Sequence, residues 1–189
     1  MTALAEELAT TDAERRALDA LRDACGESDG PMERHGARCF LLAERLAQKL
    51  ALDVDREVLL CASLLHDSGL YPAISRGGVY TVDGGLFAKQ LFTELGWKPD
   101  RVELCDLAIA RHHEMRAQWD VGAEVELVRL ADRVEVSAGL LRAGLDRAEV
   151  REIFARASRR GMYRHIGALL APIILRRPLS LLRIFRLET

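Results

Sequence analysis

The chain has 189 residues, of which 49% are apolar, so it can bury one hydrophobic core of ordinary size but hardly two. Its 27 basic and 29 acidic residues give a formal net charge of −2, so the composition does not indicate a broad cationic surface for nucleic acid. The longest nearly apolar run, residues 166–175, has about half of the ~20 residues that span a bilayer.

The cysteines occur singly, in apolar and helix-like contexts, and none belongs to a CxxC pair. They are Cys25, Cys39, Cys61 and Cys105. Such spacing is typical of buried, reduced thiols rather than of a disulfide framework. The N-terminal stretch is acidic and alternates polar with apolar residues, so we do not expect a secretory signal. These features predict a cytoplasmic protein without a transmembrane segment.

Apolar residues recur at intervals of three and four along nearly the whole chain, which predicts helices rather than strands. We expect an all-α, bundle-like fold of about seven to nine helices. In chain order these cover about 11–25, 31–50, 53–66, 83–95, 99–113 and 123–139, with one more from 146 and an interrupted one from 161. No linker or repeat divides the chain. We therefore predict a single domain over 1–189, with its core at about 32–140 and a helical extension at about 146–189.

Several helix starts are marked by ordinary capping signals. Thr11 and Glu14 have the spacing of a capping box, and so do Asp146 and Glu149. Pro31 suits the first turn of the helix that it opens.

Two further acids are expected to act as N-caps, Asp53 for the third helix and Asp83 for the fourth. Between these helices, residues 70–82 form the longest expected loop. Residues 79–82 within it are the only candidate strand.

Two polar residues stand on helix faces that should be buried. His35 lies in line with Met32 and Cys39. Asp132 lies in line with Val128 on a later helix. Burying an unpaired carboxylate costs several kcal/mol, so Asp132 needs a cation, hydrogen bonds or both. Taken alone, a core histidine is usually only hydrogen-bonded, and a core aspartate is usually paired with a neighbouring arginine.

The apolar run at 59–65 leads directly to an adjacent pair, His66 and Asp67. With His35 and Asp132 they make two imidazoles and two carboxylates from three helices. This mixed set suits Mn²⁺, Fe²⁺, Co²⁺, Ni²⁺ or Zn²⁺, and Mg²⁺ is possible. A helix cap would explain the pair alone, but the combination favours a divalent metal site.

The order His35, His66-Asp67, Asp132, with LLHDSGL around the pair and RLADRV around the last residue, resembles the HD superfamily of metal-dependent phosphohydrolases. The resemblance covers roughly residues 32–140. It implies an all-α domain of the HD type in which these four residues ligate one metal. It also implies that a metal-activated water attacks a phosphate ester, often in a nucleotide.

Dinuclear members of that superfamily carry a further histidine after the first loop, a His-His pair, and a lysine just after HD-x-Gly. His112 and His113 supply the pair here, but Leu70 stands at the lysine position and Asp83 is the nearest substitute for the missing histidine. A second metal held by Asp83, His112 and His113 is therefore an alternative. We favour one metal, with Asp83 as a helix cap.

The stretches 80–84 and 108–112 resemble a branch of the superfamily that includes cyanamide hydratase-like proteins, which add water to a nitrile-type carbon. The ligand set therefore specifies how water is activated and not which electrophile it attacks. A hydratase, a lyase, an iron oxygenase or a non-catalytic signalling domain is the alternative to a phosphohydrolase.

In the favoured mechanism, Asp67 or Asp132 accepts a proton, and His112 or His113 stabilises an oxyanion or protonates the leaving group. The substrate is expected to be a small anion, such as a nucleotide, held by arginines. The candidate substrate-binding residues are Arg38, Arg111 and Arg133. For each arginine taken singly, a structural or solvated role is the simpler interpretation.

The tail at 161–187 holds five arginines and no acid, interleaved with Ile, Leu and Phe. We expect it to pack on the bundle or on a second subunit, which leaves a homodimer as one outcome. An anionic membrane surface is the alternative, but prolines at 172 and 178 would spoil a long amphipathic helix.

Overall fold

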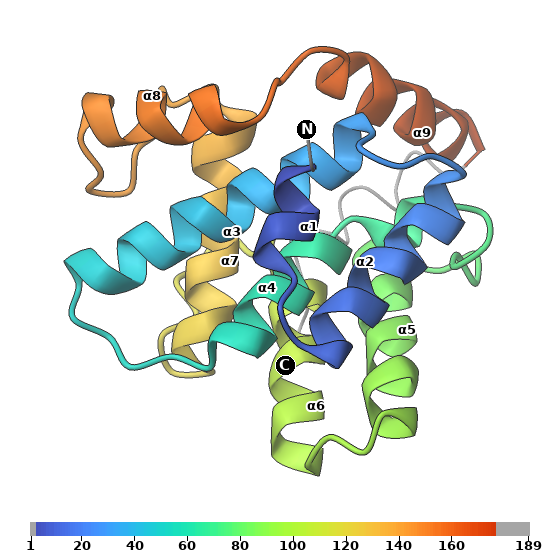
Figure 1. Ribbon diagram of the computed structural model, residues 1–189. Coiled ribbons are helices and arrows are strands. Elements are labelled where there is room, and N and C mark those ends of the chain that lie inside the picture. Colours follow the sequence, from blue (N-terminus) through green and yellow to red (C-terminus); the bar gives the residue numbers. More distant parts are fainter. Residues whose placement is uncertain (1–2, 177–189) are drawn as a thin grey trace.

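The structure, a computed structural model, describes residues 3–176. Over these residues the chain is all-α, as the sequence predicts, with nine α-helices and one 3-10 turn (Figure 1). In order they are α1 (Leu4–Leu8), α2 (Asp12–Cys25), α3 (Pro31–Lys49), α4 (Arg56–Leu65), η1 (Ser68–Leu70), α5 (Tyr80–Glu94), α6 (Pro99–Ala110), α7 (Ala123–Val136), α8 (Arg147–Arg156) and α9 (Met162–Arg176). Within this described part, no helix is both long and apolar enough to cross a membrane.

The predicted capping boxes and the proline start are confirmed. The Glu14 backbone N–H donates to Thr11 Oγ1 at 3.2 Å, and the Thr11 N–H donates to the Glu14 carboxylate at 3.0 Å. Asp146 and Glu149 close the same motif at α8. Pro31 is the first residue of α3.

Other helix bounds differ from the prediction. The N-cap of α4 is Asp55, not Asp53, and its Oδ1 accepts from the Val58 N–H at 3.1 Å. Arg101 from α6 also binds Asp55, at 2.6 Å, a contact that local sequence cannot reveal. Residues 80–82 are the first turn of α5 and not part of a strand. The short α1 was not expected. The predicted break at Pro178 lies outside the described residues, and α9 continues through Pro172.

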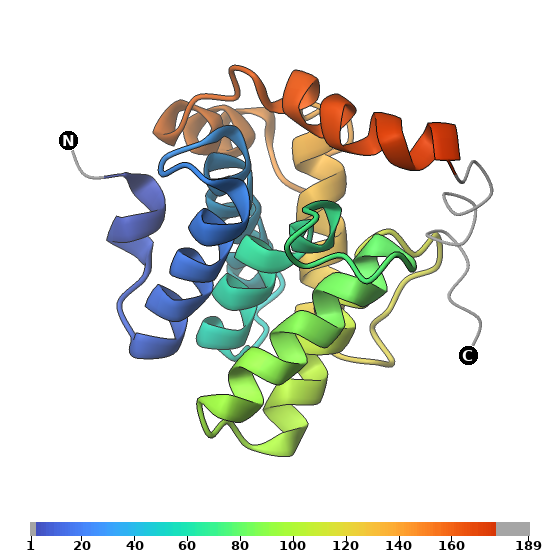
Figure 2. The same cartoon turned by 90° about the vertical axis from the view of Figure 1, so that its right-hand side faces the viewer.

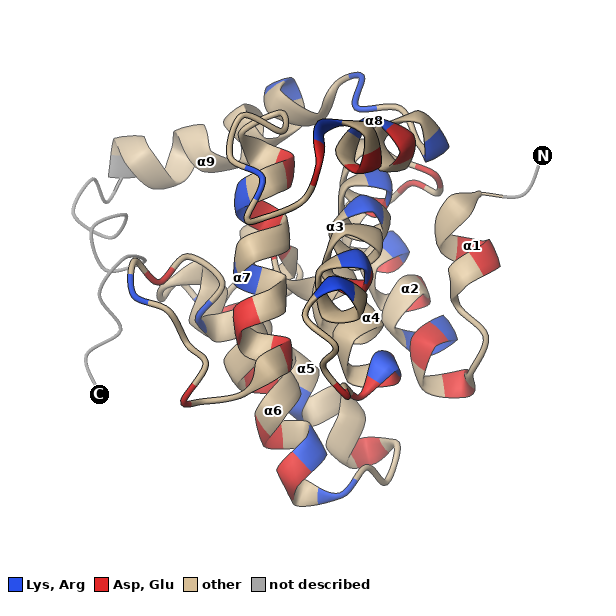
Figure 3. Cartoon of the chain, turned by 90° about the vertical axis from the view of Figure 1, so that its left-hand side faces the viewer, with Lys and Arg blue, Asp and Glu red and all other residues tan. Residues whose placement is uncertain are grey.

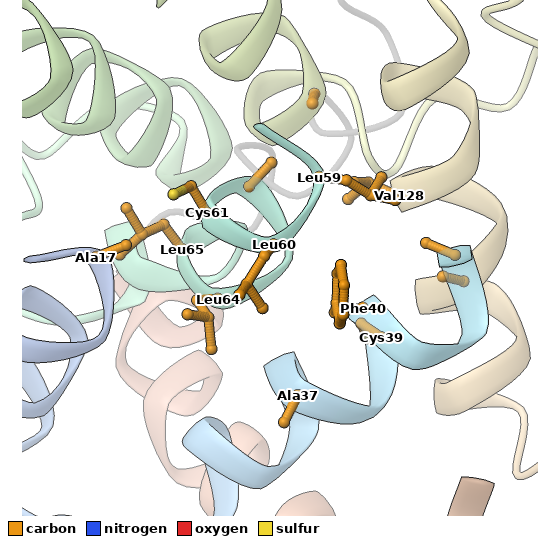
Figure 4. Packing of buried hydrophobic residues seen from close by; sticks show 14 of the residues in the cluster. Ala17, Ala37, Cys39, Phe40, Leu59, Leu60, Cys61, Leu64, Leu65 and Val128 are labelled. Carbon is orange, nitrogen blue, oxygen red and sulfur yellow. The ribbon is translucent and has the colours of Figure 1, made fainter. Parts of the chain in front are cut away.

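Helix α3 lies at the centre of the molecule. It packs against α4 and α7, while α4 also packs against α2 and α6. Helices α5 and α6 pair as a hairpin, and α8 and α9 lie across α3 at one side of the bundle (Figures 1 and 2). Buried side chains such as Phe40, Leu59 and Val128 fill the space where α3, α4 and α7 meet (Figure 4).

Two glycines allow backbones to approach closely around the LLHDSGL segment. A Cβ on Gly36 of α3 would lie 2.8 Å from the Ser63 carbonyl oxygen of α4. A Cβ on Gly69 of η1 would lie only 1.9 Å from the Tyr80 carbonyl oxygen at the start of α5. Any larger residue at either position must push these elements apart. The glycines therefore bring His35, the His66-Asp67 pair and α5 together.

Candidate metal centre

Four buried side chains converge from three directions. His35 comes from the middle of α3, and His66 follows the last turn of α4. Asp67 precedes η1, and Asp132 comes from α7. The sequence predicted that these four residues would meet, and the structure places them together.

The facing atoms of these residues are evenly spaced. His35 Nε2 lies 3.0 Å from His66 Nε2. Asp67 Oδ2 lies 3.6 Å from His35 Nε2 and 3.4 Å from His66 Nε2. Asp132 Oδ1 lies 3.5 Å and 3.6 Å from the same two nitrogens. Two ligands that each lie about 2.1 Å from one first-row cation are separated by roughly 3.0 to 3.4 Å. The separations between the carboxylate oxygens and the imidazole nitrogens are therefore close to those expected around a divalent ion.

The electrostatics suit a cation as well. Burial alone would raise the pKa of Asp132, but His35 and His66 hold it well below its usual range. The pKa of Asp67 is likewise held low, against the effect of burial, chiefly by His66 and His112. Both carboxylates are therefore ionised at neutral pH. Two adjacent buried anions require positive charge between them.

Each of the three buried histidines has a partner for its Nδ1 atom, on the side of the ring that faces away from the cluster. His66 Nδ1 lies 2.9 Å from the Ser63 carbonyl oxygen, and His112 Nδ1 lies 2.7 Å from the Ile109 carbonyl oxygen. A carbonyl only accepts, so each Nδ1 carries the proton and donates it. Each Nε2 then faces the cluster. Burial would lower the pKa of His66, but Asp67 and Asp132 raise it well above its usual range, so a bound cation would replace a proton on this Nε2. His35 Nδ1 lies 3.1 Å from Glu135 Oε2, an ion-pair contact that lacks the alignment of a hydrogen bond.

The HD domain family model matches residues 32–137, which is more than half of the chain. The chain belongs to the HD domain family. The match begins just before His35 and ends just after Asp132, so it contains all four ligand candidates. No curated protein matches the chain. The resemblance to the cyanamide hydratase branch stays a prediction.

His112 and His113 lie just beyond α6 in this HD domain, on the outer side of the two carboxylates. His112 Nε2 is 3.6 Å from Asp67 Oδ1, and His113 Nδ1 is 3.7 Å from Asp132 Oδ2. His112 Nε2 is buried and has no hydrogen-bond partner among the described residues. An acceptor nitrogen that faces a carboxylate oxygen fits a cation or a substrate proton between them.

Tyr80 is a site residue that the sequence did not reveal, because residues 79–82 were assigned to a loop. Its hydroxyl lies 2.5 Å from His113 Nε2. Burial and the nearby Asp67 charge raise the Tyr80 pKa well above its usual range, so the hydroxyl keeps its proton and donates it to His113. Burial and His112 lower the pKa of His113 to about 4, so this imidazole is neutral at pH 7. His113 Nδ1 then carries the imidazole proton and faces Asp132 as a donor.

Asp83 neither caps α5 nor joins the cluster. The N-cap is Val79, and Asp83 lies within the first turn. Its Oδ2 accepts from the backbone N–H groups of Arg76 and Gly78, at 2.7 Å and 3.2 Å. The predicted N-cap is therefore wrong, because the preceding loop folds back onto this carboxylate. Asp83 belongs to none of the groups of described residues whose donor atoms could share one ion.

Arg38 is buried, and its guanidinium is occupied by neighbouring residues. Its Nε donates to the Glu135 carboxylate at 2.7 Å, and its guanidinium also donates to the Ser158 carbonyl at 2.9 Å. The expectation that Arg38 binds substrate therefore conflicts with its geometry. Arg111 is half-buried and donates to Gln118 at 3.1 Å. Arg133 is half-buried.

Glu135 and Cys39 are two more residues that the sequence analysis did not single out. Glu135 lies one turn after Asp132, and its carboxylate is fully buried behind His35. Cys39 lies one turn after His35, and its Sγ is 3.8 Å from His35 Nδ1. It completes a group of four possible donors with His35, His66 and Asp132. Glu135 is three residues after Asp132 and Cys39 is four residues after His35, and these helical spacings are the sequence signal that could have identified both residues.

Proposed function

We propose that this HD domain is a hydrolase that cleaves a small phosphate ester with one divalent ion held by His35, His66, Asp67 and Asp132. The observation that carries the proposal is that one oxygen each of Asp67 and Asp132 lies 3.4 to 3.6 Å from both facing imidazole nitrogens, which are 3.0 Å apart, in a buried cluster. The backbone carbonyl behind His66 and the carboxylate behind His35 support it, because metal-ligating histidines usually have such partners.

A divalent cation held by these four residues would supply Lewis-acid activation of water at neutral pH. Asp67 Oδ1 faces His112 rather than the other ligands, so it can accept a proton from an attacking water. His112 Nε2 is an acceptor with no described partner and can hold that water or pass its proton on. The Tyr80 hydroxyl donates its proton to His113 Nε2, so the proton on His113 Nδ1 is the one that can face negative charge that develops on the substrate.

Arg111 and Arg133 are the proposed anion-binding residues, and a nucleotide is one possible substrate. Arg38 is no longer among them, because its guanidinium is buried against Glu135. Arg129 is likewise bound to both oxygens of Glu126, at 2.7 Å and 2.6 Å.

A second candidate is the addition of water to an uncharged electrophile, such as a nitrile. Arg38 and Arg129 favour this candidate, because each is neutralised by a buried glutamate. Their charges are therefore not available to bind a phosphate. A metal-loaded enzyme that turns over nitriles and no phosphate ester would select this candidate.

The test is a turnover screen with phosphate monoesters, nucleotides and nitriles, after purified protein has been loaded with Mn²⁺, Fe²⁺, Co²⁺, Ni²⁺, Zn²⁺ or Mg²⁺. We expect phosphate release that is lost in the double variant His66→Ala/Asp67→Ala. His165→Ala is the matched control, because it removes an imidazole from α9 and should leave turnover unchanged. Equal turnover in the double variant and the wild type would rule out a catalytic HD site.

A further inference from the structure

A cavity of about 450 Å³ lies between α9 and the segment that joins η1 to α5. In Figure 2, α9 passes over this segment. Leu70, Pro72 and Tyr80 line the cavity on one side, and Leu169 and Ile173 line it from α9. Its volume falls within the roughly 300–1,000 Å³ of small-molecule sites.

The lining of this cavity, which we call the α9 cavity, is uncharged: no Lys, Arg, Asp or Glu is among the described residues around it. Leu70 and Tyr80 form a small apolar cluster apart from the main core, and Leu169 and Ile173 pack against it. Figure 3 shows that the described part of α9 is nearly devoid of charged residues. Most of the lining side chains are apolar, with Ser75 and Tyr80 as the polar ones, so the cavity favours an apolar ligand group.

The α9 cavity adjoins the metal centre. Tyr80 belongs to both, since its side chain lines the cavity while its hydroxyl lies 2.5 Å from His113 Nε2. Leu70 connects them a second time, because its backbone N–H donates to the Asp67 carbonyl at 3.0 Å. Tyr80 is therefore the described side chain that the cavity and the candidate metal centre share, and a substrate that reaches both must pass beside it.

We propose that the α9 cavity receives the apolar group of the substrate, so that the substrate is an ester with a medium-length alkyl or aryl group rather than a nucleotide. The nature of the reactive group rests on the proposed function. The assignment of an apolar group to the substrate rests only on the lining and position of the α9 cavity. The polar edges of a nucleotide base would lose water there without gaining a charged or amide side chain as a partner.

The experiment measures binding of methyl phosphate and hexyl phosphate to the full, metal-loaded chain by calorimetry. Each buried methylene favours binding several-fold, so hexyl phosphate should bind at least about 10-fold more tightly than methyl phosphate. Ala168→Phe adds a ring to a residue that lines the cavity and should abolish this gain. Ala171→Phe, three residues further along α9 and outside the lining, should keep it. Equal affinity for the two phosphates in the wild type would overturn the proposal.

A second probe separates failure of this proposal from failure of the proposed function. 1-Hexanol, which has no phosphate, should shift the methyl NMR signals of Leu169 and Ile173 in the wild type and in Ala171→Phe, but not in Ala168→Phe. Such shifts without any phosphate hydrolysis would support the cavity and contradict the phosphohydrolase. Hydrolysis of both phosphates without NMR shifts and without a preference for the longer chain would support the phosphohydrolase and contradict the cavity proposal.

Discussion

Glu135 controls the orientation of His35. Its carboxylate is fully buried and faces His35 Nδ1 at 3.1 Å. Arg38 binds the other carboxylate oxygen at 2.7 Å, and Arg159 reaches the same oxygen at 3.2 Å. The two arginines hold the carboxylate in place, and the carboxylate fixes the imidazole with its Nε2 toward the cluster. Glu135 therefore acts on the metal centre through His35 rather than by contact with substrate.

Glu135→Gln should weaken metal binding by about 10- to 100-fold, the usual cost of losing such a partner. Competition titration of the purified protein with a chromophoric chelator measures this affinity. The matched control is Glu126→Gln, which alters another buried glutamate–arginine pair on α7 without touching a ligand. Wild-type affinity in Glu135→Gln would show that the carboxylate does not orient His35.

The same residue predicts a pH dependence of stability in the metal-free protein. Burial alone would raise the Glu135 pKa, but His35, Arg38 and Arg159 lower it from 4.5 to about 2. A carboxylate with a lowered folded-state pKa stabilises the fold fully above pH 4.5, and this contribution is lost as the pH falls toward 2. The free energy of unfolding of the wild type should therefore approach that of Glu135→Gln over this interval. Urea denaturation at several pH values measures both, and a difference that does not change with pH would contradict the assignment.

At the level of elements, the close crossing of α3 and α4 sets the distance between His35 and His66. Gly36→Ala would place a Cβ 2.8 Å from the Ser63 carbonyl oxygen, which also accepts from His66. Relief of that clash moves the helices apart. We expect a loss of about 1–3 kcal/mol in the free energy of unfolding, together with weaker metal binding.

The control for this variant is Gly167→Ala in α9, where an added Cβ meets nothing within 4 Å. That change should be neutral or stabilise the protein by up to about 1 kcal/mol, because alanine favours a helix. Thermal and urea denaturation compare the two variants, and chelator competition gives their metal affinities. Unchanged metal affinity in Gly36→Ala would mean that the α3–α4 distance does not control the site.

The sequence predicted those elements whose signals are local. The Thr11–Glu14 box and Pro31 mark helix starts through contacts within four residues, and both are confirmed. Asp83 was misassigned because its partners, the backbone N–H groups at 76 and 78, reach it only after the loop folds back. Asp53 was taken as a cap for a similar reason, since the contact between α4 and α6 fixes the start two residues later.

Those parts of the candidate site that have a local signal in the sequence could also be predicted. Polar residues on apolar faces identified the four candidate ligands, because burial without a partner is costly. The roles of Arg38 and Glu135 could not be predicted, because they pair across the interface between α3 and α7, 97 positions apart in the sequence. Tyr80 could not be placed until the start of α5 was known.

At the level of the whole molecule, the metal centre joins three parts of the chain that are distant in sequence. His35 lies in α3, the His66-Asp67 pair follows α4, and Asp132 lies in α7. An ion that binds only the folded state should therefore stabilise the whole domain. The single-domain organisation, a cytoplasmic location and a homodimer stay predictions.

Metal at 100 times its Kd should raise the free energy of unfolding by about 2.7 kcal/mol. Differential scanning calorimetry of the chelated and metal-loaded protein measures this as a rise in Tm. Asp132→Asn should show no such rise, whereas Asp106→Asn, at a half-buried position on α6 that no group of possible ligands includes, should respond as the wild type does. A metal-independent Tm in the wild type would exclude an ion that links the three helices.

The metal content of the purified protein, determined by mass spectrometry of the elements, tests the central claim most directly. Single variants that each remove one ligand are compared with the wild type and with His165→Ala: His35→Ala, His66→Ala, Asp67→Asn and Asp132→Asn. We predict one divalent ion per chain in the wild type and in His165→Ala, and essentially none in the other four. Two ions per chain in the wild type, or a full ion retained in Asp67→Asn, would contradict the account.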